Sequence, residues 1–430
     1  MGDAMPTVIY RKTLLEGFKY TLSKAVETTP FWKEKFEGLD LDGISPETLG
    51  ELTARVTIKP HDLYERSRVW PDYIREGRLF HAVMRTSGTT GRPKRVPFTP
   101  DDKRRTARQM APWVNEYFEK GERVASFFPP LPSSSGTFAL SGLENNNAGV
   151  AYFQVPITYL QNRELLLKEL EDIKPTSIWA LTATAYNLGL ILPEKLREDV
   201  KTIVVGGETL TPELAKATLE LFPNAVVIDN FGSTEDDVTG FRIVTKKGTT
   251  PFHFGESVIV LEDTGDEDYP EYKRLYITKV MSEGELTGLP LFNYDIGDLA
   301  RLENGEVVSI IRVKDVVVLS GAKLHIDQVM EIVYGHPELK DFVMLYHPLS
   351  PDNPRPKVVI RVAYEGEKPA GIEDEVRELI YEANNPVRYE VEEAKSSELI
   401  IEAVPLEKLR EGLTVRPGKT KRIYVAGKDF

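Results

Sequence analysis

Residues 202–231 read TIVVGGETLTPELAKATLELFPNAVVIDNF, and this stretch decides the fold. Two short runs rich in β-branched residues, at 202–207 and 225–231, have the composition of buried strands. Between them, the segment from Pro212 to Phe222 repeats apolar residues at helical spacing. A strand, a helix and a second strand in this order predict a unit of two parallel strands joined by a helix.

The same alternation extends toward the N-terminus. The runs RVASFFP (123–129), GVAYFQV (149–155) and SIWAL (177–181) read as further buried strands, and NRELLLKELEDI (162–173) reads as an amphipathic helix. Ahead of them, Thr99-Pro100-Asp101-Asp102 has the composition of a helix start, with a threonine cap, a proline and then acids. The sequence therefore predicts an α/β fold with a largely parallel sheet.

Beyond residue 255 the pattern changes to strands with few helices between them, as in ESVIVLED, KRLYITKV and EVVSIIRV. From about residue 315 the order reads β–α–β–β–α–β, which is a complete small α+β unit. We therefore expect a large N-terminal α/β domain with a β-rich subdomain at 1–313 and a small C-terminal α+β domain at 314–430.

Composition excludes several classes of function. The 430 residues carry a net charge of −13, with 54 basic against 67 acidic side chains, which disfavours a nucleic-acid or anionic-membrane surface. There is no cysteine, so neither a disulfide nor a cysteine-ligated zinc is available. No apolar run is long enough for a membrane helix, and the start of the chain does not resemble a secretory signal. We expect a cytoplasmic protein, and the many Glu, Lys and Arg hint at a heat-tolerant source.

The stretch 84–99, MRTSGTTGRPKRVPFT, contains a glycine- and threonine-rich loop. Gly88 and Gly91 allow the backbone to approach a ligand closely, while the threonines and Ser87 add hydroxyl groups and Lys94 adds positive charge. Such a loop suits a polyphosphate. Composition alone fits a solvated hairpin or linker equally well.

A P-loop does not account for this stretch. That motif needs Gly, four residues and then Gly-Lys-Ser/Thr, whereas Gly88 is followed by TTGRPK. A nearer match at 412–420 has five intervening residues instead of four and no buried strand in front of it.

Several motifs in order resemble those of the adenylate-forming (ANL) superfamily, which includes acyl-CoA synthetases, peptide-synthetase adenylation domains and luciferases. The similar segments are TSGTTGRPK (86–94), GGE (206–208), DNFGSTE (229–235), YDIGD (294–298), RVKD with SG (312–315, 320–321) and GK with Arg422 (418–419, 422). Within this superfamily the chain is most similar to phenylacetate-CoA ligases, which share segments like TPFWKEKF, VTIKPHDL and PFTPDD. The resemblance covers essentially the whole chain.

The resemblance implies a two-step reaction. A carboxylate attacks the α-phosphate of ATP, which gives an acyl-adenylate and pyrophosphate, and the thiol of coenzyme A then displaces AMP. It assigns the ATP phosphates to the loop residues Thr86, Ser87, Gly88, Thr89, Thr90, Gly91 and Lys94. It assigns the adenine and ribose to Gly207, Glu208, Asp229, Asn230, Phe231, Gly232, Asp298 and Arg312.

Three residues receive catalytic roles from the resemblance. Glu235 is expected to bind Mg²⁺, which takes one or two carboxylates together with phosphate oxygens. Thr234 is expected to contact the α-phosphate. Lys419 is expected to stabilise the charge that develops between the carboxylate and the α-phosphate. Standing alone, Glu235 also fits an ordinary surface acid and Lys419 a basic surface tail.

The position of Lys419 on the small C-terminal domain implies that this domain swings in for the first step and away for the second. Lys314 is the expected hinge residue. The chain departs from the family pattern at Ile311, where glycine usually precedes the hinge arginine.

The resemblance implies that the substrates are a small-molecule carboxylic acid, ATP and CoA, with Mg²⁺ as cofactor. The acid pocket is expected from 127–138, 181–187 and 206–210, which suit a modest, partly aromatic acid. Two alternatives stay open: an adenylating enzyme with another acceptor (a carrier protein, an amine or a cofactor hydroxyl that receives AMP), and a non-catalytic nucleotide-binding regulatory protein. Relatives of this group are often homodimers, and this sequence does not itself indicate an oligomeric state.

Overall fold

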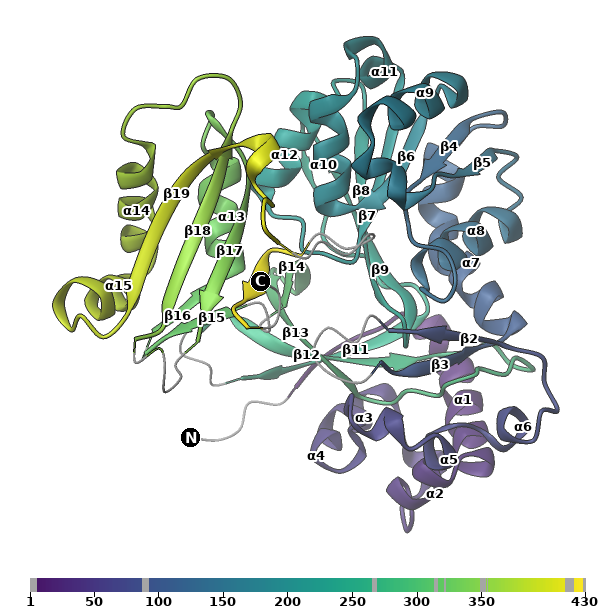
Figure 1. Cartoon of the computed structure of the whole chain (residues 1–430). Helices are drawn as coiled ribbons and strands as arrows, with labels where there is room; N and C mark the ends of the chain where they lie inside the picture. The colour runs from purple at the N-terminus through teal and green to yellow at the C-terminus, as the bar shows by residue number, and fades with distance from the viewer. Residues whose placement is uncertain are drawn as a thin grey trace. The chain divides into compact units, whose positions relative to one another are not determined.

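The structure of the chain, a computed structural model, describes residues 6–86, 93–264, 269–312, 316–320, 322–348, 353, 355–413 and 421–427 (Figure 1). The chain divides into two compact units. The first comprises Met1–Ala185, Leu192–Glu208 and Asn224–Ile311, and the second comprises Tyr186–Ile191, Thr209–Pro223 and Arg312–Phe430. The domain boundary expected at Lys314 stays a prediction, because residues 313–315 lie outside the described part.

A seven-stranded sheet forms the centre of the first unit. Its strands, in spatial order, are β10 (Gly248–Thr249), β9 (Asp237–Thr245), β8 (Val226–Ser233), β7 (Thr202–Gly206), β6 (Ser177–Leu181), β4 (Arg123–Ser126) and β5 (Ala151–Gln154). The pairs from β8 to β5 are parallel, and β9 and β10 add antiparallel strands at the other edge. This arrangement confirms the largely parallel sheet that the sequence predicted.

The helix α7 (Pro100–Tyr117) precedes β4, the first of these strands in the chain. Between the strands lie α8 (Ser135–Asn145), α9 (Arg163–Ile173), α10 (Thr182–Ile191) and α11 (Glu194–Asp199). The helix α7 begins where the sequence predicts. The Thr99 hydroxyl accepts a hydrogen bond from the Asp102 backbone N–H, and Asp102 accepts one from the Thr99 N–H. The helices α7 and α8 share a core with the sheet around Trp113 and Trp179, whose rings lie 5.5 Å apart.

A second, five-stranded sheet accounts for the β-rich part of the first unit. Its strands are β1 (Thr7–Ile9), β11 (Ser257–Asp263), β12 (Tyr272–Lys279), β13 (Tyr294–Glu303) and β14 (Glu306–Arg312). The neighbouring elements are α1 (Leu15–Thr28), α2 (Pro30–Lys35), α3 (Pro46–Glu51), α4 (Thr53–Val56), α5 (Arg66–Val69), α6 (Asp72–Arg75) and the hairpin of β2 (Ala82–Arg85) and β3 (Arg95–Phe98). Edge-to-face contacts of Phe292 with Phe18 and Trp32 mark the centre of this core.

The second unit is built on a four-stranded sheet. Its strands, in spatial order, are β19 (Glu398–Pro405), β18 (Lys357–Tyr364), β17 (Leu339–His347) and β20 (Ile423–Val425). The other elements are α12 (Pro212–Leu221), the hairpin of β15 (Val316–Leu319) and β16 (Ala322–His325), α13 (Ile326–Gly335), α14 (Ile372–Ala383) and α15 (Asn385–Arg388). The strands and helices expected beyond residue 315 are present, and β16 and β20 were not predicted.

Two long strands of the first unit escaped the sequence pattern. In β9 and β13, glycine and aspartate interrupt the apolar run, and both residue types are disfavoured in strands. Both strands position functional side chains, as described below.

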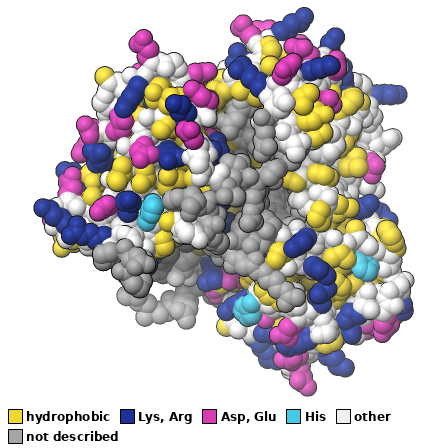
Figure 2. All heavy atoms as spheres, viewed as in Figure 1, with side chains coloured by type: hydrophobic (Ala, Val, Ile, Leu, Met, Phe, Trp, Pro, Cys, Tyr) yellow, Lys and Arg dark blue, Asp and Glu magenta, His cyan; other side chains and the backbone are white. Residues whose placement is uncertain are grey.

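The described residues contain no helix that is both long and apolar enough to cross a membrane. On the face drawn in Figure 2, acidic and basic side chains are interspersed, so no single-sign patch dominates the described residues in this view.

Candidate functional site

Three side chains from distant parts of the first unit meet at one point. The Lys94 ammonium forms an ion pair with Oε1 of Glu235 and donates a hydrogen bond of 3.3 Å to the Tyr294 hydroxyl. The Tyr294 hydroxyl in turn donates to the same Glu235 oxygen at 2.9 Å. Lys94 precedes β3, Glu235 follows β8 and Tyr294 begins β13, so the two sheets and the β2–β3 hairpin converge here.

Glu235 is ionised in this setting. Only 4% of its surface is exposed, and burial alone raises the pKa of a carboxyl group. The Lys94 ammonium and the Tyr294 hydrogen bond outweigh that effect and lower the pKa of Glu235 below its ordinary value. The site therefore presents a carboxylate beside an ammonium at neutral pH.

A tight turn between β8 and β9 presents Glu235. The Ser233 hydroxyl accepts hydrogen bonds from the backbone N–H of Glu235 at 3.2 Å and of Asp236 at 3.1 Å. At Gly232 an added Cβ would lie 2.1 Å from the carbonyl oxygen of Asp237, so any side chain there would force the backbone to shift. The turn therefore requires glycine at 232, and its hydrogen bonds set the direction of Glu235.

Thr86 and Lys94 join the two ends of the glycine-rich loop. The Thr86 N–H donates to the Lys94 carbonyl at 3.2 Å, and the Lys94 N–H donates to the Thr86 hydroxyl at 2.9 Å. The remaining predicted residues of this loop, Ser87, Gly88, Thr89, Thr90 and Gly91, lie outside the described residues, as do Lys314 and Lys419.

Residues assigned to the adenine lie at the ends of β7 and β8. Gly206 pairs with Asn230 in the sheet, and a Cβ on Gly206 would lie 2.7 Å from the Asn230 carbonyl oxygen. Gly207 follows with a left-handed φ of 80°. The side-chain oxygen of Asn230 is buried and has no hydrogen-bond partner among the described residues. The structure thus brings Gly207 and Asn230 together and leaves a polar acceptor there.

Two neighbouring acidic side chains, Asp229 and Glu208, form contacts within the protein. Asp229 forms a buried ion pair with Arg242 at 2.8 Å, and Arg242 stacks over the Phe252 ring. Burial raises the pKa of Asp229, against the opposing effect of Arg242. The Glu208 carboxylate accepts a hydrogen bond of 3.0 Å from the Ala183 N–H at the start of α10. The roles near adenine that the sequence assigned to these two side chains stay predictions.

The other predicted residues are distributed around the turn and the second sheet. Phe231 makes an edge contact with Phe252. The Thr234 hydroxyl lies 3.0 Å from that of Ser134. Asp298 is buried on β13, the strand that begins with Tyr294, and Arg312 is an exposed residue at the end of β14.

Sequence reasoning assigned no role to Tyr294 or Ser134. Tyr294 is the first residue of the YDIGD motif, and that position was the available signal for it. Ser134 lies in the segment 127–138 that was expected to line the acid pocket, but nothing in that segment indicated contact with Thr234.

The residues present fit a magnesium ion bound together with ATP. No cluster of three or more histidine, aspartate or glutamate side chains capable of holding a metal occurs among the described residues. Mg²⁺ in ATP sites needs one or two carboxylates, because phosphates and waters supply the other ligands. Glu235 is one such carboxylate, and the Lys94 ammonium already places a positive charge beside it.

Several known proteins are similar to this chain. Residues 76–270 match the family model of the AMP-binding enzymes. The D-alanine–D-alanyl carrier protein ligase of Bacillus velezensis is 21% identical over 308 residues, which cover 66% of this chain and 59% of that protein. The enzyme of the same name from Staphylococcus epidermidis is 23% identical, with 66% and 61% covered. The chain thus spans about three fifths of the length of these curated relatives.

Solved structures share the fold. A 2-hydroxyisobutyryl-CoA ligase in the postadenylation state has a TM-score of 0.72 at 16% identity, with 97% of this chain and 89% of that chain covered. The same ligase in complex with 2-HIB-AMP and CoA has a TM-score of 0.58 at 17% identity, with 96% and 89% covered. Residues 76–270 thus match the AMP-binding enzyme family, and the chain has the fold of these adenylate-forming ligases.

Proposed function

We propose that the protein is an ATP-dependent ligase that converts a carboxylic acid to its acyl-adenylate, releases pyrophosphate, and transfers the acyl group to the thiol of coenzyme A. The observation that carries this proposal is the meeting of Glu235, Lys94 and Tyr294 in a region that matches AMP-binding enzymes. The experiment that tests it is carboxylate-dependent exchange of pyrophosphate into ATP.

The first half-reaction brings two anions together, so it depends on positive charge and aligned donors. The Lys94 ammonium has three N–H donors, and among the described residues it contacts Glu235 and Tyr294. A third donor can therefore bind a phosphate oxygen of the leaving pyrophosphate. The Thr234 hydroxyl, next to Glu235, is the donor assigned to the α-phosphate.

Glu235 is the residue that would hold Mg²⁺, which supplies charge neutralisation on the phosphates when bound. Ionisation of Glu235 at neutral pH supports this assignment, because only the carboxylate form is a good ligand. Asn230 Oδ1 is suited to accept a hydrogen bond from the adenine amino group, and the Asp298 carboxylate to accept from the ribose hydroxyls.

An aryl or similarly compact acid is the proposed substrate. Phe128 and Phe138 belong to a buried aromatic core, and Ser134 between them contacts Thr234. This segment thus connects an apolar environment to the residue assigned to the α-phosphate, which suits an acid with a partly aromatic body.

A carrier-protein thiol is the second candidate acceptor. The curated relatives that we describe are named as D-alanine–D-alanyl carrier protein ligases, whereas one structural neighbour is a CoA ligase. Both acceptors present a thiol to the same acyl-adenylate, so adenylation is common to the two proposals. The cytoplasmic location and the homodimer stay predictions.

The exchange assay should be run with a panel of aryl, short-chain and amino acids, followed by mass detection of CoA thioesters. Exchange with CoA consumption supports the proposal. Exchange without thioester formation favours another acceptor, such as a carrier protein. No exchange with any acid, while ATP still binds, would favour a regulatory nucleotide-binding protein.

Lys419→Ala tests the assignment of the two half-reactions. We expect loss of adenylation by about 10²–10³-fold, because one charged contact in the transition state is removed. The reaction of preformed acyl-adenylate with CoA should remain largely intact. Equal losses in both half-reactions would contradict a role for Lys419 in the first step alone.

A further inference from the structure

Arg105, in the second turn of α7, is a fully buried cation outside the set of residues assigned above. Its side chain is 0% exposed, and its guanidinium makes hydrogen bonds to two elements of the first unit. On one side Nη1 donates to the Asp236 carbonyl at 2.9 Å and to Asp237 Oδ1 at 2.7 Å, while Nη2 lies 3.3 Å from Asp236 Oδ1. Asp236 is the last residue of the turn that contains Glu235, and Asp237 is the first residue of β9.

On its other side the same guanidinium binds the five-stranded sheet. Nη2 donates to the Glu256 carbonyl at 3.0 Å and to the Ser257 hydroxyl at 2.7 Å, and Nε donates to the Val280 carbonyl at 3.1 Å. A guanidinium offers five N–H donors in a fixed plane, so one side chain can hold both groups of acceptors in a set geometry. Arg105 therefore links the turn that contains Glu235 to β11 and to the residue that follows β12.

The turn depends on this link. Asp237 has a left-handed φ of 59°, which a residue other than glycine adopts at a cost in energy. Asp236 is held further by the Thr239 hydroxyl, which donates to its Oδ2 at 2.8 Å. Without the guanidinium, two adjacent buried carboxylates would lose their main cation, and the strained turn would lose its support.

The buried charges around Arg105 are nearly balanced. Lys279 lies 3.5 Å from Asp102 and 3.9 Å from Asp237, so Asp102, Asp236 and Asp237 face Arg105 and Lys279. A change in this cluster alters the charge next to the turn as well as its geometry.

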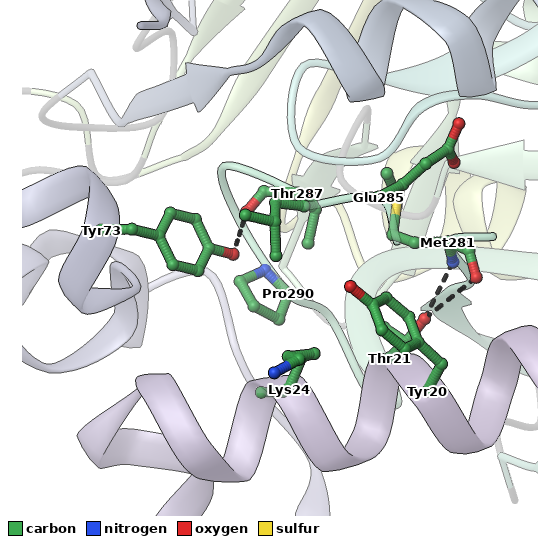
Figure 3. Close-up of a pocket in the computed structure, with 10 residues that line it drawn as sticks. Tyr20, Thr21, Lys24, Tyr73, Met281, Glu285, Thr287 and Pro290 are labelled. Atoms are coloured by element: carbon green, nitrogen blue, oxygen red, sulfur yellow. Dashed lines mark hydrogen bonds between the residues drawn. The ribbon is translucent and has the colours of Figure 1, made fainter. Parts of the chain in front are cut away.

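The cluster is also anchored away from the turn. The Thr287 hydroxyl donates to Asp102 at 2.7 Å. The Tyr73 hydroxyl donates to the Thr287 carbonyl at 2.8 Å (Figure 3). The cavity beside Thr287 and Tyr73 has a volume of about 10 Å³, room for about one water molecule. This cavity is too small for a substrate. Thr287, one of its lining residues, holds Asp102 of the cluster.

We propose that Arg105 is a positioning residue for adenylation: by binding Asp236 and Asp237 it holds the turn that directs Thr234 and Glu235 toward ATP and Mg²⁺. This inference rests on the proposed function. Arg105 is expected to touch neither substrate nor metal, and to act through the backbone that follows Glu235.

Arg105→Lys in the full-length protein tests the proposal, because it keeps the charge and removes the planar fork. We expect the kcat of exchange to fall by about 10–100-fold, since small misplacements at a reacting centre have effects of this size. The Mg²⁺ concentration for half-maximal ATP binding, measured by calorimetry, should rise several-fold, while the KM for the carboxylic acid stays within twofold. Arg108→Lys is the matched control: Arg108 lies one turn further along α7 and pairs with Glu256 and Glu285 instead of the turn.

A folded Arg105→Lys protein with wild-type kcat and wild-type Mg²⁺ dependence would overturn the proposal, and so would equal effects of the two lysine variants. If Arg105→Lys does not fold, Asp236→Asn decides, because it is isosteric and weakens the link directly. For it we expect a fall of about 3–10-fold in kcat and a higher Mg²⁺ requirement, and twofold or smaller changes in both would overturn the proposal.

A wild-type protein without exchange refutes the proposed function, and the Mg²⁺ dependence of ATP binding then decides the role of Arg105 by itself. Absence of ATP binding overturns both.

Discussion

Glu235 contacts the Lys94 ammonium and the Tyr294 hydroxyl, and both contacts favour its ionised form. Its neighbours along the chain behave differently: Asp229, six residues earlier, is buried against Arg242, and Asn230 keeps an amide oxygen without a partner among the described residues. Three polar residues of one motif thus have three different environments. At the scale of the residue, the structure separates side chains that support the fold from side chains available to a ligand.

Replacement of Glu235 by glutamine should reduce adenylation strongly. The amide keeps the shape and can still accept from Tyr294, but it removes the charge that Mg²⁺ and Lys94 require. We expect kcat for exchange to fall by about 10²–10³-fold and ATP binding to lose most of its Mg²⁺ dependence. Glu262→Gln is the control, since that carboxylate accepts a hydrogen bond of 2.9 Å from Tyr276 in the other sheet. Similar losses in both variants would contradict the assignment of Glu235.

Asn230→Ala and Asp229→Asn should affect different properties. Loss of the Asn230 oxygen should raise the KM for ATP about 3–10-fold, as expected when one hydrogen bond is lost. The melting temperature should change little. Asp229→Asn leaves Arg242 buried without its anion, so it should lower the melting temperature at nearly constant KM. The measurements are exchange kinetics and thermal unfolding. An Asp229→Asn protein of wild-type stability with a raised KM would instead place Asp229 in the nucleotide site.

At the scale of the element, the connection between β8 and β9 is the feature that presents the site. It combines a register shift after Phe231, the hydroxyl of Ser233 and a left-handed residue at Asp237. The helix α7 contributes the buried Arg105 from the side, and β13 contributes Tyr294. None of these elements forms the site alone. A substitution in the connection should therefore alter the site even where the substituted residue does not contact substrate.

Gly232→Ala tests this element. The new Cβ would lie 2.1 Å from the Asp237 carbonyl oxygen, so the backbone must shift. Overpacking of this kind costs about 1–3 kcal/mol of folding free energy, and we expect loss of exchange activity together with lower stability in urea unfolding. Gly335→Ala is the control, because its Cβ would meet its nearest atom at 3.5 Å, an ordinary contact. A Gly232→Ala protein with wild-type stability and activity would show that the connection tolerates a side chain.

At the scale of the whole molecule, each unit contains its own buried ion cluster. In the second unit, Asp341 binds Arg422 on one oxygen and Arg410 at 3.0 Å on the other, while the Tyr334 hydroxyl donates to it at 2.9 Å. Burial raises the pKa of Asp341, but the two arginines and the hydrogen bonds hold it well below its ordinary value. Ionisation of Asp341 therefore stabilises this unit at neutral pH.

The stability of the chain should depend on this group in acid. Because the pKa of Asp341 is lower in the folded state, its contribution is present above the unfolded value of about 3.9 and is lost as the pH falls below it. Asp341→Asn should cost about 3–5 kcal/mol at pH 7, since the buried Arg422 and the partly exposed Arg410 lose their anion. The difference in free energy of unfolding between this variant and wild type, measured by calorimetry, should become smaller below about pH 4. Asp374→Asn, which removes an exposed ion pair with Arg377, is the control and should change the free energy of unfolding by less than about 1 kcal/mol at either pH. A loss of stability in Asp341→Asn that does not depend on pH would contradict the assigned pKa shift.

The sequence by itself determined the parallel sheet, the start of α7 and most strands of the second unit, because these depend on local periodicity and capping. It also identified Lys94 and Glu235 as candidates, since their motifs are short and continuous. It missed β9 and β13, whose glycines and aspartates break the strand pattern. Only the tertiary structure brought Tyr294 to Glu235, paired Asp229 with Arg242 across β8 and β9, and placed Arg105 against the turn. These contacts join residues that are far apart in the chain or lie on a strand without a sequence signal, so they depend on how the sheets pack.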